Sequence, residues 1–466
     1  MRDDTSGYVV VANWRDLDHP QAGGAELVCD EVAADLARRG HRVVLLTSSV
    51  AGRPREEEVH GYTVRRRGGR FTVYAWALLW LLLHRRSVRA VIDSQNGIPF
   101  FSPLAVRRST PCLLLLHHVH QDQFALYFPR PVAAVGRFLE STVSRAVYGT
   151  RTVIAVSPST RQGAREILQL RGEVKIVPPG WRVSLDLATS SPVKTDHPSV
   201  VSVGRLVPHK RTGMTIEAVA ALRATVPDIT LDVVGGGTEL EGLKRLAADL
   251  GVDDIVTFRP HCSNEERDQV VAASWLCVNA SEGEGWGISV IEANALGTPV
   301  VAYARPGLRD SIQHGTNGWL IDDAQPLAEA AAPLLAELAA PAHRAALAAA
   351  CHGWALNFTW SAMTGRIWSA VEQETRRLSL PHPERRTGSD VSTVVRVPAE
   401  LVPVDWQPRL RHGDVVSTGP GWVEVFLANA DTSASAAVMR RVGIVDDGRI
   451  EYRVARRRDH LAPLAG

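Results

Sequence analysis

The chain has 466 residues, of which 45% are hydrophobic and 22% charged, close to the averages for globular proteins. This length exceeds one ordinary domain core, so we expect two or three folded units and exclude a disordered or collagen-like chain. The net charge of +2 hides an asymmetry, because residues 1–180 carry 24 basic and 16 acidic side chains, and the remainder carries 28 and 34. The basic first part indicates either an anionic partner or simply an arginine-rich surface.

The first part of the chain alternates predicted strands with predicted helices. A β-branched run at 8–13 is followed by Gly23 and Gly24, an amphipathic stretch at 25–39 and a second apolar run at 42–47. Strand, glycine turn, helix and strand is typical of a parallel βαβ unit. We therefore expect one α/β domain over residues 1–180, with further strands at 90–92, 112–116 and 153–156.

An apolar run at 71–83 contains one polar side chain, Thr72, and has basic flanks. Its thirteen residues are too few to cross a bilayer, which takes about 20. Two interpretations stay open: a buried core helix, or a helix at an anionic membrane surface, where Trp76 and Trp80 would help docking. The flanks comprise Arg65, Arg66, Arg67, Arg70, His84, Arg85 and Arg86.

A second series begins after the Pro/Gly linker at 177–180 and predicts a second α/β domain over residues 181–380, whose last helix packs back on the first. Ligands of open α/β sheets bind at the carboxyl ends of the strands, so we expect the site in a cleft between the two domains. The predicted strands are 199–203, 230–234, 255–258, 276–279 and 299–302, and the helices include 212–224, 239–250, 288–296 and an alanine-rich region at 326–350.

The end of the chain differs in pattern. A proline-rich linker at 381–386 precedes a small β-rich appendage, residues 387–466, for which no role is evident. Alternating apolar and polar residues predict its strands at 392–397, 422–427, 437–445 and 450–454.

The cysteines and the N-terminus indicate the compartment. Five cysteines are odd in number, widely spaced and never in a C-x-x-C pair, which argues against a disulfide scaffold or a cysteine zinc site. The chain starts Met-Arg-Asp-Asp and enters a strand at once, unlike a signal peptide. We therefore expect a cytoplasmic protein.

The most informative segment is 281–293, SEGEGWGISVIEA. Glu284 would lie on a glycine-rich loop at a helix start, and Glu292 about two turns into that helix. The first amides of the helix, at Gly287, Ile288 and Ser289, are free to bind an anion. Carboxylates that accept from hydroxyls beside phosphate-binding amides suit a phosphorylated sugar.

Two fixed cations follow the first strand of the second domain. Arg205 and Lys210 lie on one strand-end loop, where such a sheet binds its ligand. They can neutralise the charge that develops on a departing diphosphate, an effect worth about 3 kcal/mol per strong donor.

Several motifs together resemble the retaining nucleotide-sugar glycosyltransferases of family four, which have the GT-B fold of two doubly wound Rossmann-like domains facing across a cleft. The resemblance covers residues 8–375. Trp286 and Arg259 depart from it, since the family more often has phenylalanine and glycine there. The matching motifs are Gly204-Arg205 with Lys210, the turn at 235–239, the Glu284-x7-Glu292 segment, the run at 297–301 and the loop at 23–26.

The resemblance implies a role for each matching residue. Arg205 and Lys210 would hold the donor diphosphate, Glu292 the ribose hydroxyls and Glu284 the transferred sugar. Gly23 and Gly24 would let the first helix approach the donor phosphate from the opposite domain. The remaining donor contacts would come from Gly235 and from the helix start at Gly287, Ile288 and Ser289.

A strand-end histidine is also expected at the site, because the family places a functional histidine after the strand at 112–116. His117 fits best by its distance from Pro111, while His118 and His120 stay open as alternatives. The group is a poor zinc signature, because no carboxylate follows at helical spacing.

The pair Asp16 and Asp18 is interpreted as loop polarity, since it is remote in sequence from Arg205 and Lys210. With those two cations available, we expect no metal and no cofactor to be required.

We therefore predict an enzyme that moves a sugar from a nucleoside-diphosphate sugar to an acceptor hydroxyl with retention. The alternatives are a GT-B nucleotide-sugar hydrolase or epimerase, and a nucleotide-binding oxidoreductase, although the latter lacks G-x-G-x-x-G after the first strand. The basic apolar region in the first domain favours a lipid-linked acceptor or cell-envelope glycan precursor at an anionic membrane surface. No nucleic acid partner is expected.

Overall fold

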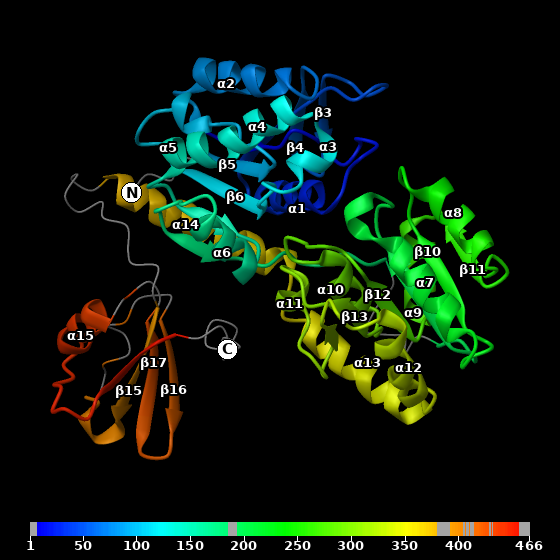
Figure 1. The fold of residues 1–466 in the computed structure, drawn as a ribbon. Helices are drawn as coiled ribbons and strands as arrows, with labels where there is room; N and C mark the ends of the chain where they lie inside the picture. Colours follow the sequence, from blue (N-terminus) through cyan, green and yellow to red (C-terminus); the bar gives the residue numbers. More distant parts are fainter. Residues whose placement is uncertain are drawn as a thin grey trace.

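The computed structural model describes residues 7–184, 193–379, 392–403, 406, 410, 414–427, 430 and 432–455. These residues form three sheets that follow one another along the chain (Figure 1). The two larger sheets have helices on both faces, which confirms the predicted pair of Rossmann-like domains, and the third forms a small β-rich unit. Residues 1–4 and the predicted linker at 381–386 lie outside the described residues.

The first sheet has eight strands in the order β3-β4-β2-β1-β5-β6-β7-β8. All neighbouring pairs are parallel except β3 and β4, which form an antiparallel hairpin that the sequence analysis did not predict. The strands are β1 (Tyr8–Ala12), β2 (Arg42–Thr47), β3 (Glu56–Val59), β4 (Tyr62–Arg66), β5 (Val88–Asn96), β6 (Cys112–His118), β7 (Val153–Ala155) and β8 (Val174–Ile176).

Helices cover this sheet on both faces because its apolar residues alternate. Val9 and Val11 on β1 pack toward α1 (Gly24–Arg38) and α14 (Trp360–Ser379), which returns from beyond the second sheet. Val10 and Ala12 face the other way, toward α2 (Thr72–His84). The remaining helices are α3 (Phe124–Tyr127), α4 (Arg130–Phe138), α5 (Ser144–Tyr148) and α6 (Pro158–Glu166), with short turns at Ser102–Leu104 and Leu139–Val143.

Helix α2 forms from the apolar run at 71–83 and combines parts of both interpretations. One face packs on the sheet through Val73, Ala77 and Trp80, whereas Leu79 and Leu83 on the other face are 54% and 73% exposed. The suggestion that Trp80 docks at a membrane is therefore wrong, because its ring is buried against the core. Among the described residues, no helix is both long and apolar enough to cross a membrane.

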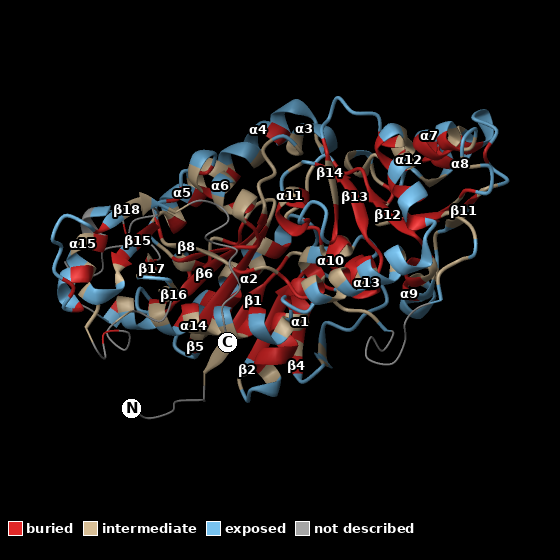
Figure 2. Ribbon diagram, turned by 90° about the horizontal axis from the view of Figure 1, so that it is seen from below, coloured by how far each residue is buried: buried red, intermediate tan, exposed pale blue. Residues whose placement is uncertain are grey.

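The second sheet has six parallel strands in the order β11-β10-β9-β12-β13-β14. The strands are β9 (Ser199–Val203), β10 (Thr230–Val234), β11 (Val256–Arg259), β12 (Leu276–Asn279), β13 (Val300–Tyr303) and β14 (Gly318–Ile321). The helices are α7 (Thr212–Leu222), α8 (Leu240–Asp249), α9 (Asn264–Ala273), α10 (Ile288–Ala295), α11 (Leu308–Ser311), α12 (Leu327–Leu338) and α13 (Pro341–Ala355). Buried residues concentrate on the strands and inner helix faces (Figure 2).

The strand orders locate the ligand-binding edges. In the first sheet, β2 lies on one side of β1 and β5 lies on the other side. In the second sheet, β10 and β12 flank β9 in the same way. Ligands of such sheets bind where the order reverses, outside the carboxyl ends of the strands. The loops after β1, β9 and β12 carry the predicted motifs at 23–26, 204–210 and 281–287.

The third sheet is antiparallel, in the order β16-β17-β15-β18. The strand predicted at 437–445 is wrong, because α15 (Thr432–Arg441) occupies most of it. The buried positions follow helical spacing, at Ser435, Met439 and Val442. Nearby apolar residues that alternate with polar ones made this segment look like a strand in the sequence. The strands are β15 (Thr393–Pro398), β16 (Val415–Gly419), β17 (Trp422–Leu427) and β18 (Glu451–Val454).

Candidate active site

The loops after β9 and β10 lie side by side at the carboxyl edge of the second sheet. Gly204 has a φ of +155°, and a Cβ on Gly235 would overlap the carbonyl oxygen of Gly204, so glycine is required for this contact. Arg205 follows directly and is half-buried. Within the described part of the chain no carboxylate pairs with its guanidinium, so its charge is available to an anion.

Lys210 and Glu284 join the loop after β9 to the loop after β12. The Lys210 ammonium pairs with the Glu284 carboxylate, and their side chains are only 19% and 17% exposed. Ser281 Oγ donates a second hydrogen bond to the same carboxylate at 2.9 Å. Burial alone would raise the pKa of Glu284, but the Lys210 charge and these hydrogen bonds outweigh it and lower the pKa. Glu284 is therefore ionised at neutral pH.

The start of α10 meets the start of α1 from the other domain. Gly287 caps α10 with a φ of +89°, a left-handed conformation that favours glycine. A Cβ on Gly24 would lie 3.1 Å from Cδ1 of Ile288, and one on Gly23 would lie 3.5 Å from Nε of Arg205. Thus the structure brings the predicted Gly23, Gly24, Arg205 and Ile288 together, beside the unpaired first amides of α10 that include Ser289.

Glu26 in the first turn of α1 holds this junction and was not assigned a role from the sequence. Its carboxylate accepts from the Gly23 amide at 2.7 Å and from Arg15 Nε at 3.0 Å, with both side chains buried. Burial lowers the pKa of Arg15 although the Glu26 charge opposes this shift. The glutamate three residues after a helix N-cap was the sequence signal for this interaction.

Glu292 lies closer to the helix start than the sequence analysis placed it. Because α10 begins at Ile288, Glu292 is its fifth residue, just over one turn in rather than about two. Burial raises the pKa of Glu292 to about 7, although the nearby charge of Arg267 opposes the shift. Hydrogen bonds from ligand hydroxyls would stabilise a buried carboxyl of this kind.

The three histidines at the end of β6 and just after it have different surroundings. His117 is buried, and its Nε2 is 2.9 Å from Ser94 Oγ, which in turn donates to Asn13. His118 instead approaches the Glu284 loop, since a Cβ on Gly283 would lie 3.8 Å from its Cε1. Burial lowers the pKa of His118 to about 3, so its ring is neutral. The geometry therefore favours His118, not the expected His117, as the histidine beside Glu284.

The backbone of His117 still contributes to the junction. A Cβ on Gly285 would overlap the His117 carbonyl oxygen, so only glycine lets the loop after β12 lie against the end of β6. Thr160 Oγ1 donates to the Gly285 carbonyl at 3.2 Å. Trp286 is 2% exposed and packs in the same hydrophobic cluster as Val32 of α1, which ties the two domains together here.

The interpretation of Asp16 and Asp18 as loop polarity is wrong for Asp16, which is buried. Arg66, whose side chain is 2% exposed, pairs with Asp16, with Asp18 at 2.8 Å and with Glu57 at 2.6 Å. Arg66 therefore neutralises the buried Asp16 and two partly exposed carboxylates, and it does not belong to an exposed basic cluster. Arg65 pairs with Glu56 at 3.0 Å on the neighbouring strand.

Neither this carboxylate group nor any other cluster in the described ranges has three or more side chains arranged to hold a metal. Arg259, which departs from the family pattern, pairs with Asp232 at 2.7 Å. That ion pair lies on adjacent strands β10 and β11, at the side of the sheet beyond the Arg205 loop.

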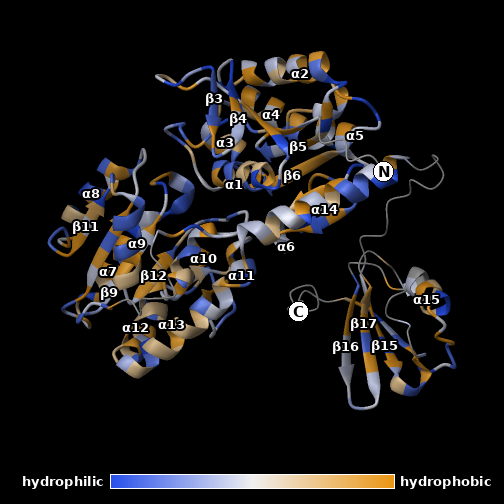
Figure 3. Cartoon of the chain, turned by 180° about the vertical axis from the view of Figure 1, so that it is seen from behind, coloured by the Kyte–Doolittle hydropathy of each residue, from blue (hydrophilic) through white to orange (hydrophobic). Residues whose placement is uncertain are grey.

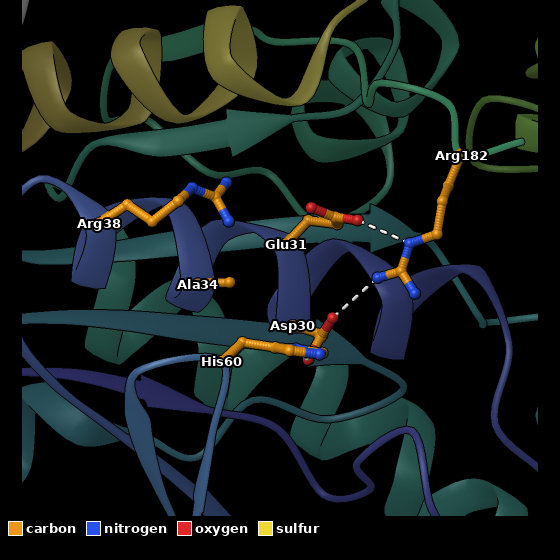
Figure 4. A pocket seen from close by; sticks show the side chains of 6 residues that line it. All are labelled: Asp30, Glu31, Ala34, Arg38, His60 and Arg182. Carbon is orange, nitrogen blue, oxygen red and sulfur yellow. Dashed lines mark hydrogen bonds and ion pairs between the residues drawn. The ribbon is translucent and has the colours of Figure 1, made fainter. Parts of the chain in front are cut away.

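A surface pocket of about 420 Å³ lies beside α1, lined by none of the predicted site residues (Figure 4). Arg182, just beyond the linker, donates to Glu31 at 2.7 Å and to Asp30 at 2.9 Å across it. The Arg182 charge in this pocket is thus paired with carboxylates of the pocket itself, and these ion pairs connect α1 to the segment after the linker.

Two Rossmann-like domains with cations and helix amides at their switch points define the GT-B class. The family model described as Glycosyltransferase Family 4 matches residues 22–184, and that described as Glycosyl transferases group 1 matches residues 186–348. The chain belongs to the glycosyltransferases of family four, which confirms the resemblance.

Among curated relatives, a GDP-mannose-dependent α-(1-6)-phosphatidylinositol monomannoside mannosyltransferase of Mycolicibacterium smegmatis is 38% identical, over 37% of this chain and 47% of its own. A D-inositol 3-phosphate glycosyltransferase of Acidothermus cellulolyticus is 31% identical, over 46% and 53%. The matches thus span about half the length of these relatives. The solved sucrose-phosphate synthase of Thermosynechococcus elongatus shares the fold, with a TM-score of 0.64, 20% identity and coverage of 79% of this chain and 98% of its own.

Proposed function

We propose that the protein transfers a sugar from a nucleoside-diphosphate sugar to an acceptor hydroxyl with retention at the anomeric carbon. The observation that carries the proposal is the gathering of Arg205, Lys210 and the first amides of α10 beside Glu284. Cations and amides suit a diphosphate leaving group, and an ionised carboxylate suits the hydroxyls of a sugar. Retention rests on family membership.

In this account each group has a defined task. Arg205, Lys210 and the amides of Ile288 and Ser289 neutralise the charge that develops as the glycosidic oxygen leaves with the diphosphate. Glu284, fixed by Lys210 and Ser281, orients the transferred sugar, and Glu292 binds the ribose hydroxyls. The acceptor hydroxyl forms the new bond to the anomeric carbon, and its proton leaves with the diphosphate oxygen or through His118. No metal is needed for these steps.

The donor is a nucleoside-diphosphate sugar in this proposal, in keeping with the GDP-mannose dependence in the name of one relative.

The proposed compartment is the cytoplasm. The five cysteines are all free thiols, and four are buried, which suits a reducing environment.

We propose a lipid-linked acceptor at an anionic membrane surface, because the first domain exposes apolar side chains next to arginines that pair with no carboxylate of the described residues. Helix α2 is largely hydrophobic (Figure 3). Segment α3–α4 adjoins it, since the Arg70 guanidinium lies 4.5 Å from the Phe128 ring centre. The exposed apolar residues are Phe71, Leu79, Leu82, Leu83, Leu126, Val132, Val135 and Phe138, and the exposed basic ones are Arg67, Arg70, Arg85, Arg86, Arg130 and Arg137. Such a surface suits a bilayer with anionic headgroups.

The test is nucleotide release from a panel of UDP-, GDP-, ADP- and dTDP-sugars, with and without a total membrane lipid extract. The proposal expects one donor to release its nucleoside diphosphate, faster with lipid, and the sugar to appear on the lipid. Release at the same rate without lipid, with free sugar as the product, would instead support a nucleotide-sugar hydrolase. If no donor releases nucleotide, the proposal fails.

A further inference from the structure

Tyr127 of the first domain reaches across to the loop that carries Lys210. Its hydroxyl lies 2.5 Å from Nδ1 of His209, and the two rings meet edge to face with centroids 6.1 Å apart. Tyr127 ends α3, whereas His209 lies in the short 3-10 turn η3 (Pro208–Lys210), directly before Lys210. This contact therefore joins the acceptor-side domain to the proposed diphosphate loop.

The charge state of His209 decides which hydrogen bond its ring can form. Burial, aided by the Lys210 charge, lowers the pKa of His209 to about 4, so the imidazole is neutral at physiological pH. A neutral imidazole has one donor and one acceptor nitrogen, and a tyrosine hydroxyl can donate or accept, so the hydrogen bond between Tyr127 and Nδ1 of His209 forms with either tautomer. The contact is therefore a hydrogen bond between two neutral groups.

His209 is also fixed to the other side of the site. Its carbonyl oxygen accepts from the amide of Glu282 at 2.9 Å, two residues before Glu284. Movement of His209 would therefore move both ends of the Lys210–Glu284 ion pair. A group that holds His209 also positions this pair.

The segment that carries Tyr127 contacts the loops of this ion pair twice. His118 approaches the Glu284 loop near Gly283, and Tyr127, a few residues later, contacts His209. Between them, the Phe124 amide donates to the His120 carbonyl at 3.0 Å, and the His120 amide donates to the buried Glu140 at 2.7 Å. The segment is thus anchored in the first domain while it touches the second domain at the residues that precede Glu284 and Lys210.

We infer that Tyr127 is a positioning residue for the transfer reaction, which acts through His209 to hold the Lys210–Glu284 pair in place when the two domains come together. The inference rests on the proposed function and extends it, since Tyr127 belongs to the same α3–α4 segment that exposes apolar residues to the acceptor. The hydrogen bond between Tyr127 and His209 would then couple placement of the lipid acceptor to placement of the donor diphosphate.

The test is a double-mutant cycle of Tyr127→Phe, His209→Leu and the double variant, measured as steady-state nucleotide release from the donor that the panel identifies, with lipid extract present. Each single variant should lower kcat/KM by about threefold to tenfold, as expected for loss of one hydrogen bond. The kcat/KM of the double variant should be no lower than that of the less active single variant, because both changes remove the same hydrogen bond. Tyr127→Phe should also raise the share of donor that is hydrolysed rather than transferred, which a purely structural role would leave unchanged.

The matched control is Tyr8→Phe, which removes a hydroxyl that accepts from Arg42 at 3.2 Å on the first sheet. This variant should keep wild-type kinetics. The inference is overturned if Tyr127→Phe matches the wild type, if the two single effects simply add, or if Tyr8→Phe is equally impaired. A wild type that releases no nucleotide would reject the proposed function instead.

Discussion

Lys210 and Glu284 form an ion pair that links the loop after β9 to the loop after β12. Each loop begins at the carboxyl end of a strand next to the switch point of the second sheet. A cation from one loop thus stands beside a carboxylate from the other, where a charged leaving group and a sugar would meet.

Arg205→Ala and Lys210→Ala should each reduce turnover by about 10²–10³-fold, because each removes a fixed positive charge from the leaving group. The fold should survive, since neither side chain is in a hydrophobic core. Lys244→Ala is the control, because Lys244 forms a comparable lysine–glutamate pair at 2.8 Å on the exposed face of α8. Unchanged turnover in either site variant would reject the assignment.

Activity should survive EDTA, because side-chain cations and helix amides hold the diphosphate. Nucleotide release is measured before and after chelation, and again after Mg²⁺ or Mn²⁺ is added. A complete loss that either ion restores would show that a metal takes part.

The protein should co-sediment with anionic liposomes, and less so as salt rises, since each basic side chain near such a surface contributes about 1 kcal/mol. Neutralising Arg67, Arg70, Arg85 and Arg86 should weaken binding. Neutralising Arg223, an arginine of the second domain that pairs with Asp254, is the control and should not. If the wild type ignores anionic liposomes at low salt, a soluble acceptor is the better account.

Arg66 should behave differently from its exposed neighbours. Arg66→Gln removes the partner of the buried Asp16, and breaking a buried pair typically costs about 3–5 kcal/mol of folding stability. Thermal unfolding would show a large loss for Arg66→Gln and little change for Arg67→Gln. Equal stability of the two variants would contradict the buried network.

Glu292 should make stability depend on pH. Its pKa of about 7 in the folded protein lies above the ordinary value of 4.5, so the folded state holds a proton that the unfolded state releases. Stability contributed by this carboxyl is therefore present below about pH 4.5 and lost as pH rises toward 7. Glu292→Gln should raise the Tm of the unliganded protein at pH 8 but not at pH 4.5, while raising the donor KM. A Tm gain that is the same at both values would contradict this origin.

The sequence predicted much of the fold because long apolar runs and glycine turns mark parallel strands and the helices between them. The hairpin of β3 and β4 was missed, since the charged residues of Glu56–Val59 form no apolar run. Helix α15 was misread because Val442 and Ile444, which follow the helix, are buried in alternation with exposed residues, as in a strand.

At the site, the sequence placed Arg205 and Lys210 on the loop after one strand and Glu284 on a loop at a helix start, as the structure has them. These positions could be predicted because each motif directly follows a recognisable apolar strand. It could not show that Arg66 is buried, since Asp16 and Asp18 lie about fifty residues away along the chain. The sequence favoured His117 over His118 by its distance from Pro111, but neighbouring strand residues face opposite ways, and that distance does not say which way the site lies.

The most direct test of the central claim is a crystal structure of the protein with the nucleoside diphosphate of its donor. The account predicts the diphosphate within hydrogen-bond distance of Arg205, Lys210 and the first amides of α10. A nucleotide bound elsewhere, for example beside Arg182 and Asp30, would contradict it.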